Sequence, residues 1–192
     1  LDKLDENDQE IKLKLDQVIS MLENLSQMQR SRSLDSKIKP EFSPVKPNVN
    51  ELRLAEKLHT IVKNVGWKML PDDKKAMAAN SVAVSLYGSQ KICQAISILE
   101  EAIKEDVKNS ELYFNYFQAL QASGRDKEAV DAYNKAVALK PSIGLFPPEK
   151  YVMTGIIGRG GMGVVYKANW LERNMSVAIK VLLLPDEWYP GL

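Results

Sequence analysis

The chain is poor in the residues that stabilise small secreted domains and in the long apolar runs that span membranes. It contains a single cysteine, Cys93, in 192 residues, so no disulfide can form within the chain. We expect Cys93 to be a buried, unreactive thiol and the compartment to be the reducing cytoplasm. The longest apolar runs, such as 181–184, are too short to cross a bilayer, and no signal peptide is visible.

An excess of charge of one sign is also lacking. Lys and Arg number 26 and Asp and Glu number 25, which gives a net charge of +1. This balance gives no reason to expect a nucleic acid or an anionic membrane as partner. The only histidine, His59, has no cluster of Cys, Asp or Glu near it in the sequence, so we expect a structural or solvated side chain and no metal site. The chain begins with Leu1, which is compatible with a fragment, a processed start or an unusual start codon.

Residues 1–30 carry a heptad pattern without Gly or Pro. Its a and d positions are Leu1, Leu4, Ile11, Leu15, Val18, Leu22 and Leu25, with Asp8 and Gln29 as polar exceptions. The pattern has two interpretations: a short coiled coil that dimerises the protein, or a single amphipathic helix that packs on another part of the same chain.

A change in composition marks the next two segments. Residues 31–50 mix serines, lysines and three prolines, which predicts an extended, flexible linker. Residues 51–75 then show apolar residues with helical spacing, ending near Gly66, and we expect this helical segment to cap the region that follows.

Between residues 76 and 143 the chain repeats itself with a period of 34 residues, so that Ala95, Leu99 and Ala102 recur as Ala129, Tyr133 and Ala136. This pattern resembles two tetratricopeptide repeats, each a pair of antiparallel helices. The second copy is the better match, with the family's signature positions at Tyr113, Leu120, Gly124, Ala129, Tyr133, Ala136 and Pro141. Phe117 departs from the family, because a small residue is usual at that place.

Three residues predict where the helices of the second copy end. We expect Gly124 to end the first helix, Asp126 to cap the second, and Pro141 to stop it. The resemblance implies a concave face that binds a protein partner. In this family the first helices line that face, here including Asn80, Tyr87, Phe114, Asn115 and Gln118. The alternative is that the repeats serve only for packing.

After a short linker at 144–150, the periodicity changes from helical to strand-like. Gly158, Gly160 and Gly163 have G-x-G-x-x-G spacing and lie between two runs rich in β-branched and aromatic residues. A third such run carries Lys180 in the sequence Val-Ala-Ile-Lys. A dinucleotide-binding loop requires a helix directly after its glycines, and here a strand follows.

The linked G-x-G-x-x-G-x-V and V-A-I-K motifs resemble the N-terminal lobe of protein kinases, most closely that of bacterial serine/threonine kinases of the eukaryotic type. The resemblance covers Tyr151 to Leu184. It implies that the glycine loop closes over the phosphates of ATP and that Lys180 pairs with the α- and β-phosphates. Ile157, Val165 and Ala178 would enclose the adenine. The complete set of implied ATP-binding residues is Ile157, Gly158, Arg159, Gly160, Gly161, Met162, Gly163, Val165, Ala178 and Lys180.

Other parts of a kinase are not found in these 192 residues. They contain no H-R-D catalytic loop and no D-F-G motif, which supply the catalytic base and the Mg²⁺ ligands. Glu187 is too close to Lys180 to be its helix partner. We therefore expect no phosphate transfer by this chain and weak or absent ATP binding. We also expect three strands without a covering helix to leave an apolar face exposed.

The sequence thus predicts a mainly α fold: an N-terminal helix, helical hairpins, and the opening antiparallel strands of a kinase lobe at 151–192. Its parent protein would be a serine/threonine kinase that uses ATP and Mg²⁺, with the helices recruiting a protein. The rival hypothesis is a non-enzymatic interaction protein with a vestigial kinase-like end.

Overall fold

A computed structural model describes residues 2–35, 46–105 and 108–182. The described residues form six α-helices followed by one three-stranded antiparallel sheet. This confirms the expected mainly α fold with a small antiparallel sheet. The chain divides into two compact units, 1–108 and 109–192. The boundary falls between the two predicted helical hairpins, so each unit is described by itself.

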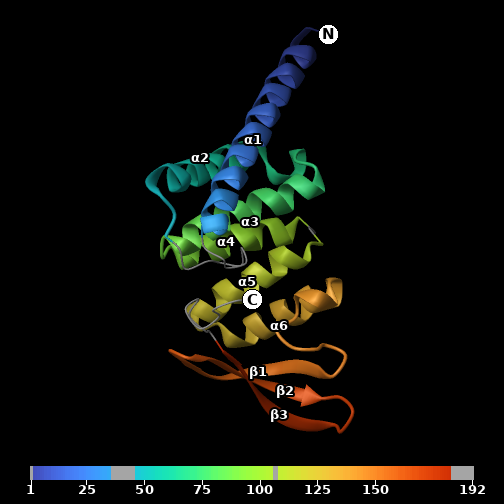
Figure 1. Cartoon of the computed structure of the whole chain (residues 1–192). Coiled ribbons are helices and arrows are strands. Elements are labelled where there is room, and N and C mark those ends of the chain that lie inside the picture. The colour runs from blue at the N-terminus through green and yellow to red at the C-terminus, as the bar shows by residue number, and fades with distance from the viewer. Residues whose placement is uncertain (1, 36–45, 106–107, 183–192) are drawn as a thin grey trace. The chain divides into compact units, whose positions relative to one another are not determined.

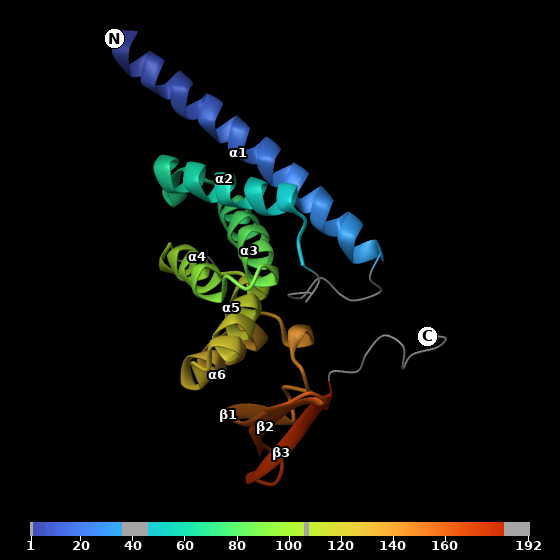
Figure 2. The same ribbon diagram turned by 90° about the vertical axis from the view of Figure 1, so that its left-hand side faces the viewer.

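The first unit is entirely helical in its described part (Figures 1 and 2). It consists of α1 (Asp2–Asp35), α2 (Val49–Val65), a 3₁₀ turn (Trp67–Met69), α3 (Asp72–Gly88) and α4 (Ile92–Lys104). Asn48 begins α2, because its side-chain oxygen accepts a hydrogen bond from the backbone N–H of Glu51 at 2.9 Å. Gly66, with φ at 90°, ends α2 at the predicted place.

The C-terminal half of the heptad seam of α1 packs against other helices of the first unit. Val18, Leu22 and Leu25 are buried, and α1 contacts both α2 and α3. The seam is less enclosed nearer the N-terminus, where Ile11 and Leu15 are only half-buried. Figure 2 shows α1 crossing α2 and extending beyond it. For residues 18–25 the second interpretation therefore holds: this seam packs on the same chain and is not open to a partner helix. A coiled coil over all of residues 1–30 is not confirmed.

The polar exception at the end of the seam, Gln29, has a partner on α3. Its side-chain nitrogen donates to the carbonyl oxygen of Ser81 at 2.7 Å and to Oγ of Ser85 at 3.1 Å. Ser85 in turn donates to the buried carboxylate of Glu51 on α2 at 2.9 Å. These hydrogen bonds join α1, α2 and α3, and a buried polar group without them would destabilise the core.

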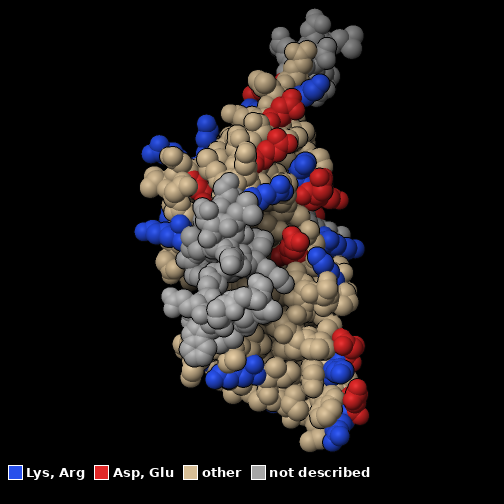
Figure 3. All heavy atoms as spheres, viewed as in Figure 1, with Lys and Arg blue, Asp and Glu red and all other residues tan. Residues whose placement is uncertain are grey.

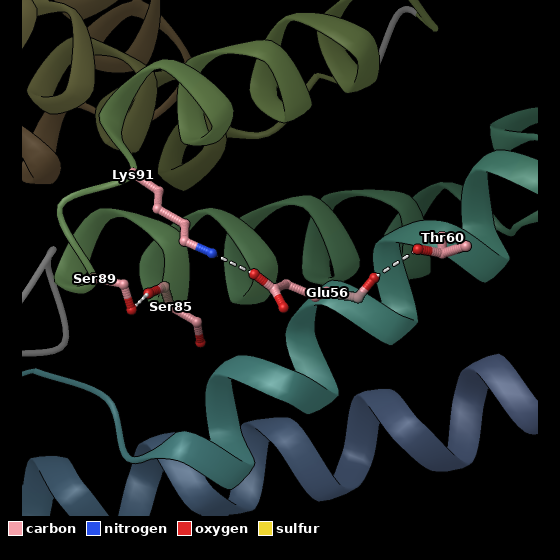
Figure 4. Close-up of polar contacts among 5 residues, drawn as sticks. All are labelled: Glu56, Thr60, Ser85, Ser89 and Lys91. Atoms are coloured by element: carbon pink, nitrogen blue, oxygen red, sulfur yellow. Dashed lines mark hydrogen bonds and ion pairs between the residues drawn. The ribbon is translucent and has the colours of Figure 1, made fainter.

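A second polar connection joins α2 to the hairpin of α3 and α4. Figure 4 shows Lys91, just before α4, reaching to the carboxylate of Glu56 on α2. Thr60 donates to the carbonyl oxygen of Glu56 one turn away, and Ser89 donates to that of Ser85. The ion pair is exposed, so it orients α2 more than it stabilises the unit.

The expectation for Cys93 is wrong, because this side chain is exposed. Cys93 lies in the first turn of α4, whose buried face is formed by Ala95, Ile96, Ile98, Leu99 and Ala102. Positions 93, 94 and 97 are exposed. They fall on the other side of the helix, as its 3.6-residue period requires.

The second unit consists of a helical hairpin and the sheet. The hairpin is α5 (Ser110–Ser123) and α6 (Asp126–Leu139), followed by a 3₁₀ turn (Pro141–Ile143). The strands are β1 (Tyr151–Gly160), β2 (Gly163–Trp170) and β3 (Met175–Leu182), in the order β1-β2-β3.

Two of the three predicted helix ends of the hairpin are confirmed. Gly124 ends α5 in the left-handed conformation, with φ at 79°, and α6 ends just before Pro141. The cap at Asp126 is wrong: Arg125 precedes α6, and no side chain caps the helix. Asp126 is the first residue of α6, and its carboxylate pairs instead with Arg159 on β1.

Aromatic side chains join the hairpin to the sheet. The ring of Phe117 lies 5.2 Å from that of Tyr133 and 6.3 Å from that of Tyr166 on β2. Phe146, within the expected linker at 144–150, is buried and lies 6.2 Å from Tyr166. The unusual aromatic residue at 117 thus fills the space between helices and sheet. Each such pair contributes roughly 0.5–1.5 kcal/mol beyond its buried area.

The helices cover part of one face of the sheet, which partly corrects the expectation of an uncovered apolar face, since Val177, Ile179 and Val181 on β3 are only half-buried. Met153, Val164, Tyr166 and Ala168 are buried on this face. The side chain of Asn134 on α6 donates to the carbonyl oxygen of Met153 at 3.0 Å. The inner side chains of β2 are therefore buried without a further helix.

Phe114 does not line an open face for a protein ligand. It is buried, and its ring lies 5.5 Å from Phe117 and 6.5 Å from Tyr133. Asn115 is buried as well. Two of the five residues expected on the concave face are therefore enclosed in the structure.

Candidate functional site

The glycine loop is the turn between β1 and β2. Gly160 at the end of β1 pairs with Gly163 at the start of β2, and Gly161 and Met162 form the turn between them. The pairing shifts between Met153 and Gly155, and again between Ile156 and Gly158. These irregularities bend β1 on its way into the loop, as β-bulges do.

Three predicted site residues lie side by side across the sheet. Gly158 on β1 pairs with Val165 on β2, and Val165 pairs with Lys180 on β3. Paired residues of antiparallel strands present their side chains on the same face. Lys180 therefore stands on the face opposite to the helices, next to the backbone of the loop. Its side chain is exposed, and no carboxylate in the described part of the chain forms an ion pair with it.

An open hollow of about 530 Å³ lies against the loop. Eight of the ten predicted residues line it: Gly158, Arg159, Gly160, Gly161, Met162, Gly163, Val165 and Lys180. Its size falls within the range of small-molecule sites. Ile157 is 59% exposed, at the second irregularity of β1, and is not one of these lining residues. Ala178, exposed on the same face as Lys180 and paired with Lys167, is not one of them either.

The glycines of the loop have two different physical roles. Gly163 has φ at 144°, and a methyl group there would overlap the carbonyl oxygen of Val181 and lie 3.0 Å from Cα of Leu182. The fold itself therefore requires glycine at 163. A methyl group at Gly158, Gly160 or Gly161 would meet nothing within 4 Å. Their missing side chains leave the loop backbone open to a ligand.

Behind the loop, two polar contacts connect the strands to the helices. The guanidinium group of Arg159 pairs with the carboxylate of Asp126 on α6. The hydroxyl of Tyr166 donates to the side-chain oxygen of Gln121 on α5 at 2.7 Å. Burial raises the pKa of Tyr166 to about 12, although the hydrogen bond to Gln121 acts in the opposite direction. Tyr166 is therefore a neutral, structural group at ordinary pH.

Sequence analysis did not identify the residues of α5 and α6 that contact the strands beside the loop. Asp126 and Arg159 are 33 residues apart, and Gln121 and Tyr166 are 45 apart. Neither pair belongs to one helix or one hairpin, so no local pattern connects them. The only sequence feature that favours Asp126 is its place in the first turn of a helix, where a carboxylate is stabilised by the helix dipole.

A second hollow, of about 340 Å³, lies in the first unit between α2 and α4. His59 lines it, and Nε2 of His59 lies 3.7 Å from the carboxylate of Glu101, which also accepts a hydrogen bond from Trp67. This agrees with a structural His59. Among the described residues no group of three or more His, Cys, Asp or Glu could hold a metal ion.

Comparison of the chain with protein-family models, curated proteins and solved structures finds no match. The resemblances to kinases and to tetratricopeptide repeats therefore depend on the quoted motifs alone. No helix in the described ranges combines the length and apolar character needed to cross a bilayer. Basic and acidic side chains alternate over the face drawn in Figure 3, in keeping with the net charge of +1.

Proposed function

We propose that residues 151–182 are the ATP-binding opening of a serine/threonine protein kinase, and that the chain is the N-terminal part of that enzyme. The observation that carries the proposal is the row of Gly158, Val165 and Lys180 across three strands, beside a glycine loop with free space above its backbone. Loop N–H groups would face the phosphates, and the Lys180 ammonium group would neutralise their charge.

The residues on the exposed face of the sheet support the proposal that the adenine of ATP packs on Val165 and Ala178. Val165 and Ala178 lie on the same face as Lys180, in neighbouring rows of the register. A flat ring could pack on these small apolar side chains while its phosphates reach the loop. Mg²⁺ would be bound by residues of the parent enzyme other than those described, since no metal-binding group is found among the latter.

Titration of the chain with Mg²⁺-ATP, followed by NMR of the amides of residues 158–163, tests the proposal. We expect weak binding, with a dissociation constant of about 1 mM or more, or roughly 4 kcal/mol or less. Lys180→Met should weaken binding by at least about tenfold, because a hydrogen bond to a charged group contributes ~1.5–3 kcal/mol.

Lys150→Met is the matched control. This substitution removes the same charge from an exposed side chain just before β1, at the end of the hairpin opposite to the glycine loop. Equal effects of the two substitutions, or loop amides that do not shift with ATP, would contradict the proposed site.

For the helical part we propose recruitment of a protein substrate or regulator in the cytoplasm. The equivalent positions of both hairpins, including Ala95, Leu99, Ala129 and Ala136, are buried, as in paired helices of a repeat. A coiled coil with a second copy would have to use the part of α1 before Val18, because the seam from Val18 to Leu25 is occupied.

The rival function is a non-enzymatic interaction protein. The reading frame beyond Leu192 discriminates between the two: H-R-D and D-F-G motifs downstream support the enzyme, and a stop codon supports the adaptor. If the frame continues, Lys180→Met in the longer protein should abolish phosphate transfer, whereas Lys150→Met should retain it.

A further inference from the structure

Arg159 connects the glycine loop to a helix. In β1 this residue pairs with Val164, whose side chain is buried on the helix-covered face of the sheet. The side chain of Arg159 is therefore directed away from the face that carries Lys180. Its guanidinium group meets the carboxylate of Asp126, the first residue of α6.

Few other side chains hold the loop. Gly158, Gly160 and Gly161 have no side chain, and Met162 is 72% exposed. Glycine-rich backbone loses more conformational entropy on ordering than any other, so a side-chain contact adds order to this loop beyond its pairing with β2. In the described part of the chain, the Arg159–Asp126 pair is the ion pair that joins the loop to the helices.

Asp126 belongs to a helix that is held in place by buried side chains and a hydrogen bond. Helix α6 buries Ala129, Tyr133 and Ala136, and its Asn134 is hydrogen-bonded to the backbone of β1. The ion pair therefore connects a packed helix to the end of the β1–β2 hairpin. The pair is about two-fifths exposed, 38% for Arg159 and 39% for Asp126, so its contribution is modest and salt-dependent.

We propose that Asp126 is a positioning residue of the glycine loop: by holding Arg159 behind the loop, it keeps the loop backbone in place for phosphate. The inference rests on the proposed function for its ligand, but the anchoring itself is measurable without a ligand. The expected direction of the change in ATP affinity is also distinctive. Removing a negative charge near an anion site lessens Coulomb repulsion and should tighten anion binding. Loss of the contact between Asp126 and Arg159 should instead weaken it.

Asp126→Asn in the full chain tests this, with Glu128→Gln as the matched control. Glu128 lies on the same first turn of α6, and its exposed pair with Arg125 does not touch the loop. Asp126→Asn should raise the hydrogen-exchange rates of loop amides 158–163 by up to about fivefold. It should also weaken Mg²⁺-ATP binding by a similar factor, and Glu128→Gln should do neither.

The exchanged pair, Asp126→Arg with Arg159→Asp, should restore slow exchange of the loop. Equal loop exchange in Asp126→Asn and wild type overturns the anchor, and so does tighter ATP binding by Asp126→Asn than by Glu128→Gln. If loop exchange rises as expected but no variant, wild type included, shifts with ATP, the anchor stands and the proposed function is refuted.

Discussion

Replacing Gly163 by alanine should unfold the β2–β3 pairing, whereas the same change at Gly158 should leave the fold intact. At 163 the new methyl group overlaps the carbonyl oxygen of Val181, a backbone atom that cannot rotate away, and φ of 144° is strained for any residue with a Cβ. Backbone strain alone costs of order 1–3 kcal/mol. At 158 the methyl group meets nothing within 4 Å.

Thermal unfolding, followed by circular dichroism, measures the difference. A loss of about 2 kcal/mol lowers the Tm of a domain of 60–100 residues by roughly 8–16 °C, and the second unit has about this size. Gly158→Ala should melt with the wild-type chain but weaken ATP binding, because its methyl group stands where phosphate approaches. A Gly163→Ala variant that melts like wild type would refute the division of the glycines into structural and ligand-facing residues.

Two further predictions concern the cores of the two units. Leu22→Ala should cost ~2–5 kcal/mol in urea unfolding, because Leu22 is buried, while Leu13→Ala on the exposed side of α1 should change stability by less than about 0.5 kcal/mol; similar losses would contradict the observed packing of α1. Since the pKa of Tyr166 is raised from 10.0 to about 12, its contribution to stability is complete below pH 10 and is lost as the pH rises towards 12. Tyr166→Phe should show a shallower decline over this range, and identical pH slopes would be evidence against a buried hydroxyl.

Local patterns determined most of the elements. The 3.6-residue spacing placed the helices, and the β-branched runs placed the strands, because these periodicities reflect backbone geometry within a few residues. Gly66 and Gly124 ended their helices where expected, since only glycine adopts such positive φ angles without strain. Eight of the ten expected site residues lie together, because seven of them belong to one hairpin.

Contacts between distant segments were not predictable in the same way. Asp126 is of a residue type that often caps helices, but its carboxylate pairs with Arg159 on β1. Cys93 was expected to be buried from its residue type, and the rotation of α4 exposes it. Phe117 departs from the repeat pattern because it packs against Tyr166 of the sheet, a neighbour that the repeat itself does not contain.

By itself, the sequence determined which faces of the chain are apolar, where its helices and strands lie, and that the glycines and Lys180 belong to one hairpin and its neighbouring strand. Only the tertiary structure decided what covers each face. The seam of α1 packs on α2 and α3, and the inner face of the sheet packs on α5 and α6. The reason is physical: burial of apolar surface is favourable against any complementary partner, and the identity of that partner depends on how the whole chain packs.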